Sequence, residues 1–142
     1  MKSYLLLLFL LPFIHSCDSD GQTNNNRYLP NYNFSEPIDM SLPTFSQLRF
    51  PGNPVYVSRA GLGINGVIIM NTGNSYVAYE ASCPNQDLSS CSMLQISGIK
   101  AVCPCDNVEY SLYDGSPSVP KEFTLKPYRV EQTGGTLLRV YN

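Results

Sequence analysis

The sequence has 142 residues, of which 43% are hydrophobic and only 14% are charged, and its formal net charge at pH 7 is −2. This length suffices for one domain with its own hydrophobic core. The mildly acidic balance excludes the excess of basic residues on which nucleic-acid binding depends. Eleven prolines, ten glycines and ten tyrosines favour short strands joined by turns over long helices.

The first sixteen residues have the pattern of a signal peptide. Lys2 precedes an uncharged apolar run over residues 4–14, which is too short to span a bilayer comfortably and is typical of a secretory signal. The next residues, Ile-His-Ser-Cys at 14–17, resemble the lipobox of bacterial lipoproteins, which implies cleavage after residue 16 and lipidation of Cys17. We therefore expect a lipid-anchored, extracytoplasmic protein of the bacterial cell envelope, at the outer membrane or cell surface. Ordinary secretion with a free Cys17 is the alternative.

Cleavage would also remove His15, which is the single histidine of the sequence. A mature chain without histidine excludes a Ser-His-Asp or Cys-His catalytic unit, a His-ligated metal and a histidine pH switch. We therefore expect that the chain is not an enzyme by itself. Four acidic residues near the later loops have the composition of solvated turns and predict no paired-carboxylate hydrolase: Asp87, Asp106, Glu109 and Asp114.

Two segments precede the predicted strands of the mature chain. Residues 17–26 are small and polar, which predicts a flexible tether. Residues 27–54 mix aromatic side chains with five prolines, which predicts an extended segment that packs on the surface of the domain. Residues 55–142 carry neither a repeat nor a helical period, and they predict a small antiparallel β domain.

Short β-rich runs in this domain alternate with turn residues. Three pairs of runs are separated by turns at residues 71–74, 97–98 and 133–135, so three hairpins are predicted. The fold class is therefore all-β. We expect the strands at residues 55–57, 66–70, 75–80, 93–96, 99–102, 108–112, 128–131 and 136–141.

Four cysteines fall in two loops that bracket the second predicted hairpin. Cys83 and Cys91 belong to the first loop, and Cys103 and Cys105 belong to the second. Because a hairpin returns the chain to its start, the two loops are expected to lie side by side at one end of the domain. An even number of cysteines in an oxidising compartment indicates two disulfides. A metal centre between the loops is the alternative.

The cysteine loops and their flanking strands resemble the two ligand boxes of a Rieske iron–sulfur domain. Residues 79–84, Tyr-Glu-Ala-Ser-Cys-Pro, are similar to box one, and residues 103–115, Cys-Pro-Cys-Asp-Asn-Val-Glu-Tyr-Ser-Leu-Tyr-Asp-Gly, are similar to box two. The resemblance covers residues 50–142. It implies a Rieske-like sandwich and a 2Fe–2S cluster that transfers electrons, in which Cys83 and Cys103 would hold one iron.

The sequence departs from this family where two histidines would hold the second iron. Asn85 and Asp106 occupy those positions, so the standard ligation by two cysteines and two histidines is impossible. The family also places a loop-clamping disulfide cysteine at the position of Cys105, and the resemblance implies Cys91 as its partner.

Three states of the cysteine loops stay open. The first is a 2Fe–2S cluster with unusual ligands, and the second is a structural zinc site. The third is a cluster-free scaffold or partner-binding domain, in which a Cys83–Cys103 bond joins the Cys91–Cys105 bond.

Thiol–disulfide exchange and partner binding are two further functions that the residues suggest. Exchange through Cys103 and Cys105 is disfavoured, because Asp106 and Glu109 oppose thiolate formation and no helix follows. Five tyrosines offer a surface for a redox or structural protein partner, although their alternation on strands favours packing in half-buried positions: Tyr76, Tyr79, Tyr110, Tyr113 and Tyr128.

Overall fold

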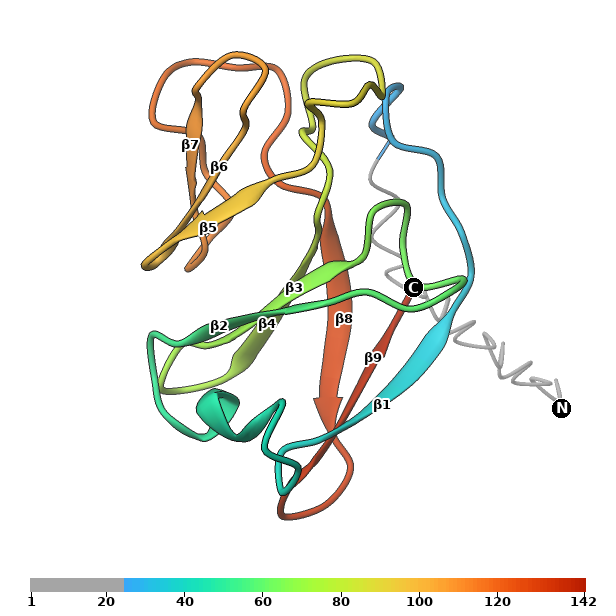
Figure 1. The fold of residues 1–142 in the computed structure, drawn as a ribbon, viewed down its shortest axis with the longest axis vertical. Coiled ribbons are helices and arrows are strands. Elements are labelled where there is room, and N and C mark those ends of the chain that lie inside the picture. The colour runs from blue at the N-terminus through green and yellow to red at the C-terminus, as the bar shows by residue number, and fades with distance from the viewer. Residues whose placement is uncertain (1–24) are drawn as a thin grey trace, which may run out of the picture.

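Figure 1 shows the fold in a computed structural model, which describes residues 25–142. The predicted signal peptide at 1–16, the lipidation site Cys17 and all but the last two residues of the predicted tether lie outside the described residues. Within residues 25–142, no helix has the length and apolar character needed to cross a membrane.

The regular secondary structure of residues 25–142 is almost entirely antiparallel strands, as the sequence predicted. Six strands form one curled sheet in the order β1-β9-β8-β4-β3-β2, and three form a smaller sheet in the order β5-β6-β7. The predicted hairpins are confirmed as β3/β4, β5/β6 and β8/β9. The elements are β1 (Ser35–Asp39), the short 3-10 helix η1 (Ser46–Arg49), β2 (Pro54–Val57), β3 (Val67–Asn71), β4 (Tyr76–Glu80), β5 (Gln95–Ser97), β6 (Lys100–Val102), β7 (Glu109–Ser111), β8 (Pro127–Gln132) and β9 (Leu137–Tyr141).

Strand β3 separates two hydrophobic cores. Its side chains alternate between the faces of the sheet, as in any strand, yet all five of its residues are buried. Val67 and Ile69 pack into the core beneath β1, β8, β9 and η1. Ile68 and Met70 pack into a second core, which the small sheet and the cysteine loops cover. The apolar run of β3 is continuous because both of its faces are covered.

The proline-rich segment before β2 contributes a strand that the sequence did not single out. β1 pairs with β9 along its whole length, from Ser35 opposite Tyr141 to Asp39 opposite Leu137. β1 is an edge strand, which accommodates Pro37 because one side of the strand needs no backbone donor. Contact with the C-terminal strand, rather than local propensity, therefore sets the course of this segment.

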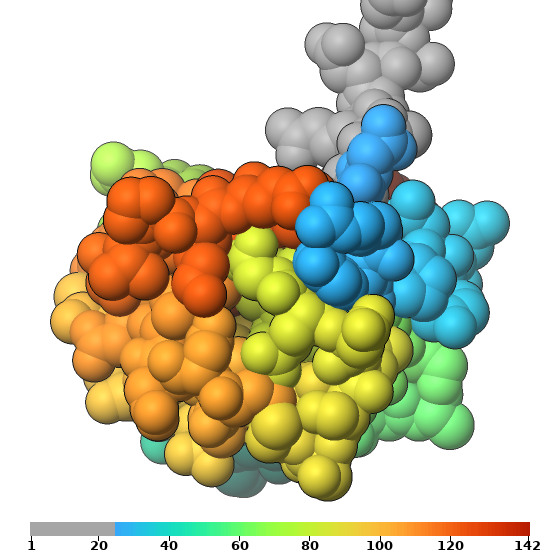
Figure 2. Space-filling view, turned by 90° about the horizontal axis from the view of Figure 1, so that it is seen from above, coloured from blue at the N-terminus to red at the C-terminus, as the bar shows by residue number. Residues whose placement is uncertain are grey.

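Residues 25–34, which precede β1, form a strap against the end of the domain that carries the cysteine loops. Asn26 donates a hydrogen bond from Nδ2 to the carbonyl of Pro84 at 2.7 Å. Lys126, which is only 1% exposed, donates from Nζ to the carbonyls of Leu29 at 3.0 Å and Pro30 at 2.7 Å. Burial lowers the pKa of Lys126. Figure 2 shows this blue strap packed beside the yellow loop that follows β4.

Candidate functional site

The two cysteine loops lie side by side and are joined by two disulfides. Cys83 is bonded to Cys103, with a Cα–Cα distance of 5.5 Å, and Cys91 is bonded to Cys105, with a Cα–Cα distance of 5.2 Å. Both distances are usual for disulfides. The first loop connects β4 to β5 and the second connects β6 to β7, so the β5/β6 hairpin brings them together as expected.

The two disulfides have different surroundings. Cys83 and Cys103 are each 1% exposed and belong to the core between the two sheets. Cys91 is exposed, and Cys105 is half-buried. The Sγ atoms of Cys83, Cys103 and Cys105 nevertheless lie within 4.8 Å of one another, so the four sulfurs form a single cluster.

Asn85, at the position of a family histidine, is held by three hydrogen bonds. Its Nδ2 donates to the hydroxyl of Tyr110 at 3.0 Å and to the carbonyl of Phe123 at 2.7 Å. Its Oδ1 accepts from the backbone N–H of Phe123 at 2.9 Å. Asn85 therefore fastens the first cysteine loop to the segment before β8.

Asp106, at the position of the other histidine, shapes the second loop. Its Oδ1 accepts from the backbone N–H of Val108 at 3.1 Å, and its Oδ2 forms an ion pair with Nζ of Lys121 at 2.9 Å. The hydrogen bond to Asp106 raises the pKa of Lys121. Asn107 follows at φ +58°, a conformation that asparagine tolerates better than most side chains. Asn107 thus lets the loop make its tight turn after Asp106 without a glycine.

These residues do not fit a 2Fe–2S cluster, which needs four free donor groups. The sulfurs of Cys83 and Cys103 are bonded to each other. The Oδ1 of Asn85 and both carboxylate oxygens of Asp106 already accept hydrogen bonds. No histidine occurs among the described residues. The donor set instead serves to fasten the two loops.

A buried carboxylate that the sequence did not single out lies on β4. Glu80 is fully buried and accepts hydrogen bonds from the backbone N–H groups of Ile64 at 2.7 Å and Asn65 at 2.9 Å. The hydroxyls of Ser82 at 2.8 Å and Tyr128 at 2.6 Å donate to it as well. Because these four donors all bond to the Glu80 carboxylate inside the fold, Glu80 orders the loop before β3, residues 58–66. Gly63 of that loop is the signal that the sequence offers, since a Cβ at this position would lie 2.6 Å from Oε2 of Glu80.

Most of the tyrosines considered as a contact surface are buried. Tyr79, Tyr110 and Tyr128 belong to the two cores, and Tyr76 is half-buried. Burial is the main cause that raises the pKa of all three core tyrosines, to about 12 for Tyr79. Tyr113 is 45% exposed. The packing expected from strand alternation therefore accounts for the three core tyrosines.

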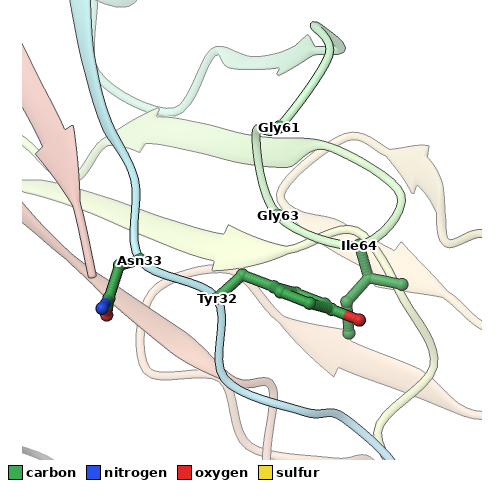
Figure 3. Close-up of a pocket in the computed structure, with 5 residues that line it drawn as sticks. All are labelled: Tyr32, Asn33, Gly61, Gly63 and Ile64. Carbon is green, nitrogen blue, oxygen red and sulfur yellow. The ribbon is translucent and has the colours of Figure 1, made fainter.

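Two hollows on the surface of the described domain lie near the strap and near the exposed disulfide. One, of about 400 Å³, lies between the strap and the loop before β3. Figure 3 shows the Tyr32 ring extending toward Ile64 in this hollow, while the Asn33 side chain points away. The other, of about 540 Å³, lies beside the exposed disulfide and is lined by Cys91 and Pro104, among others.

Comparison with known proteins yields structural likeness alone. No family model and no curated protein matches the sequence. The ferredoxin of carbazole 1,9a-dioxygenase from Nocardioides aromaticivorans IC177 is similar at 21% identity, with a TM-score of 0.45 over 73% of this chain and 95% of that chain. The putative NADH-dependent nitrite reductase small subunit from Mycobacterium tuberculosis is similar at 18% identity, with a TM-score of 0.47 over 79% of this chain and 97% of that chain.

A third solved structure is that of the quaternary ammonium Rieske monooxygenase CntA in complex with the inhibitor MMV12. It is 17% identical, with a TM-score of 0.51 over 78% of this chain and 31% of that chain. At such identity the likeness concerns the fold and not the ligands. The order of the strands, the paired cysteine loops and this likeness lead to one conclusion: the described domain has a Rieske-like fold.

Proposed function

We propose that this chain is a lipid-anchored protein of the bacterial cell envelope, and that its Rieske-like domain is a cluster-free, disulfide-stapled scaffold that binds a protein partner. The observation that carries the proposal is the Cys83–Cys103 bond, which consumes the two cysteines that match the family's iron ligands. Asn85 and Asp106 support it, because their donor atoms fasten the loops instead of facing a vacant site. On this proposal the chain is not an enzyme by itself.

Anchoring rests on the lipobox and on Cys17, which we propose carries the lipid at the outer membrane or cell surface. The strap supports a tether that leaves the domain at the end with the cysteine loops, because Asn26 donates a hydrogen bond to the carbonyl of Pro84 in the first loop. The disulfides suit an oxidising compartment outside the cytoplasm. The net charge of −2 argues against a nucleic-acid partner.

An electron-transfer domain with unusual ligands is the second candidate. The Rieske-like fold and the close approach of three sulfurs favour it. It would require the Cys83–Cys103 bond to open and other donors to replace Asn85. A cluster also needs reduced thiols, whereas all four cysteines of the described chain are bonded.

Metal and labile-sulfide analysis of the full chain distinguishes the two candidates. The protein is purified with its anchor in detergent from anaerobic, iron-replete cells, and its visible spectrum is recorded. We expect neither iron nor sulfide, and non-reducing mass spectrometry should find both disulfides. Iron and sulfide at about two each per chain would overturn the cluster-free proposal and favour electron transfer.

A further inference from the structure

The Cys91–Cys105 disulfide is the one of the two described disulfides that solvent reaches. Cys91 is exposed and Cys105 is half-buried, whereas Cys83 and Cys103 are each 1% exposed. A thiol in solution can approach Cys91 directly. It can approach the buried pair only after the loops open.

A serine hydroxyl lies against both sulfurs of the exposed pair. The Oγ of Ser89 is 3.2 Å from Sγ of Cys91 and 3.7 Å from Sγ of Cys105. The buried Ser92 holds this serine in place, because its hydroxyl accepts from the backbone N–H of Ser89 at 2.8 Å. A hydroxyl in this position can donate to a thiolate that forms on either sulfur, which stabilises the leaving group of an exchange reaction.

The negative charge beside Cys105 is neutralised. Asp106 is the next residue in the chain, and an unpaired carboxylate there would oppose a thiolate on Cys105. Its Oδ2, however, lies 2.9 Å from Nζ of Lys121. The ion pair offsets the part of the repulsion that Asp106 contributes.

A hollow of about 540 Å³ opens beside this disulfide, and Cys91 itself lines it. Met93, Leu94 and Pro104 give the hollow apolar walls, so it suits an apolar side chain next to an incoming cysteine. The adjacent β5 is an edge strand of the small sheet, and its outer side has no strand partner within residues 25–142. An extended peptide can pair with such an edge.

We propose that Cys91–Cys105 is a thiol–disulfide exchange site that oxidises dithiols in extended, apolar segments of partner proteins, while Cys83–Cys103 remains structural. A partner thiolate attacks Sγ of Cys91, the Cys91–Cys105 bond breaks, and its electron pair passes to Sγ of Cys105. The second partner thiol then attacks the mixed disulfide and releases Cys91.

The overall step transfers two electrons from the partner's two thiols to the Cys91–Cys105 pair. The partner leaves with a disulfide, and the two protons go to Cys91 and Cys105 or to solvent. Exchange with the disulfide of another protein, by the reverse steps, restores the oxidised pair. This redox activity goes beyond the scaffold role, in which the chain by itself catalyses no reaction, and it does not depend on the absence of a cluster.

The first test compares the two disulfides in the full-length, detergent-solubilised chain. The oxidised protein is incubated with dithiothreitol, samples are quenched with N-ethylmaleimide over time, and mass spectrometry identifies the labelled cysteines. We expect Cys91 and Cys105 to be labelled together, at least about tenfold faster than Cys83 and Cys103. Circular dichroism verifies that the protein stays folded. Equal rates, or faster labelling of the buried pair, would overturn the proposal.

The second test asks for exchange rather than mere reducibility. The oxidised chain is mixed with a reduced model peptide that carries two cysteines and apolar flanking residues, and peptide disulfide is quantified. We expect one peptide disulfide per chain, with two thiols gained at Cys91 and Cys105. The control is the double variant Cys91→Ser/Cys105→Ser, which retains Cys83–Cys103 and should form none. Failure of the unaltered chain to oxidise the peptide would also overturn the proposal, whatever the metal analysis shows.

Discussion

Removal of the buried disulfide should destabilise the domain more than removal of the exposed one. The two closed loops interleave, so with either bond intact the other closes an effective loop of only about ten residues, and each contributes about 3 kcal/mol by loop entropy. Cys83→Ala/Cys103→Ala also removes two sulfurs from the core, at about 1 kcal/mol each. The free energy of unfolding should therefore fall by about 5 kcal/mol in this variant and by about 3 kcal/mol in Cys91→Ala/Cys105→Ala.

Urea unfolding without reductant, followed by far-UV circular dichroism, measures both losses against the unaltered chain. A loss of about 5 kcal/mol approaches the whole stability of a small domain, so the buried-pair variant should be marginally folded at 25 °C. Equal losses in the two double variants would refute the reasoning, because only burial distinguishes them. A greater loss in the exposed-pair variant would refute it as well.

Three further predictions concern the buried carboxylate, a core tyrosine and the anchor. Gly63→Ala should lower the free energy of unfolding by about 3 kcal/mol, because a Cβ there would lie 2.6 Å from Oε2 of Glu80. The control Gly61→Ala, where a Cβ would meet no atom within 4 Å, should lower it by about 1 kcal/mol. Equal unfolding midpoints of the two variants in urea would contradict this. The free energy of unfolding should fall by about 2 kcal/mol through Tyr79 as the pH rises from 10 to 12, because Tyr79 has a pKa of about 12 when folded and keeps a proton that the unfolded chain has lost. Tyr79→Phe should remove this part of the alkaline loss, and an unchanged pH profile would exclude Tyr79 as its source. Metabolic labelling with palmitate should mark the chain in a bacterial host and not its Cys17→Ser variant; label retained by the variant would place the lipid elsewhere.

The hairpins could be predicted from the sequence because local signals define them. Alternating apolar residues and turn residues such as those at 71–74 specify a strand pair without reference to distant parts of the chain. Strand β1 was missed because Ser-Glu-Pro-Ile-Asp carries little strand propensity of its own. Its partner β9 lies about a hundred residues away, and a pairing of that kind has no local signature.

The candidate site, too, could be predicted from the sequence only where local signals define it. The hairpin between the loops predicted that the cysteines would come together, and the structure contains two disulfides there. Asn85 and Asp106 were identified by their positions, yet their actual partners, Phe123 and Lys121, belong to a later segment that the sequence could not place. The buried Glu80 was missed because an acidic residue on a strand is ordinarily assigned to the solvent face.

The strap at the start of the described chain has a mechanical consequence. If Cys17 is anchored in a membrane, any tension on the domain enters through its N-terminal side and meets the contacts of the strap in chain order. The hydrogen bond from Asn26 to Pro84 would bear the load first, followed by the ion pair of Arg27 with Glu122, then by the two bonds from Lys126, and only then by β1. Pro84 adjoins Cys83, so the first load passes into a covalent cross-link to the opposite loop. If a tether pulls at this point, the cross-linked loops therefore share the load from the start.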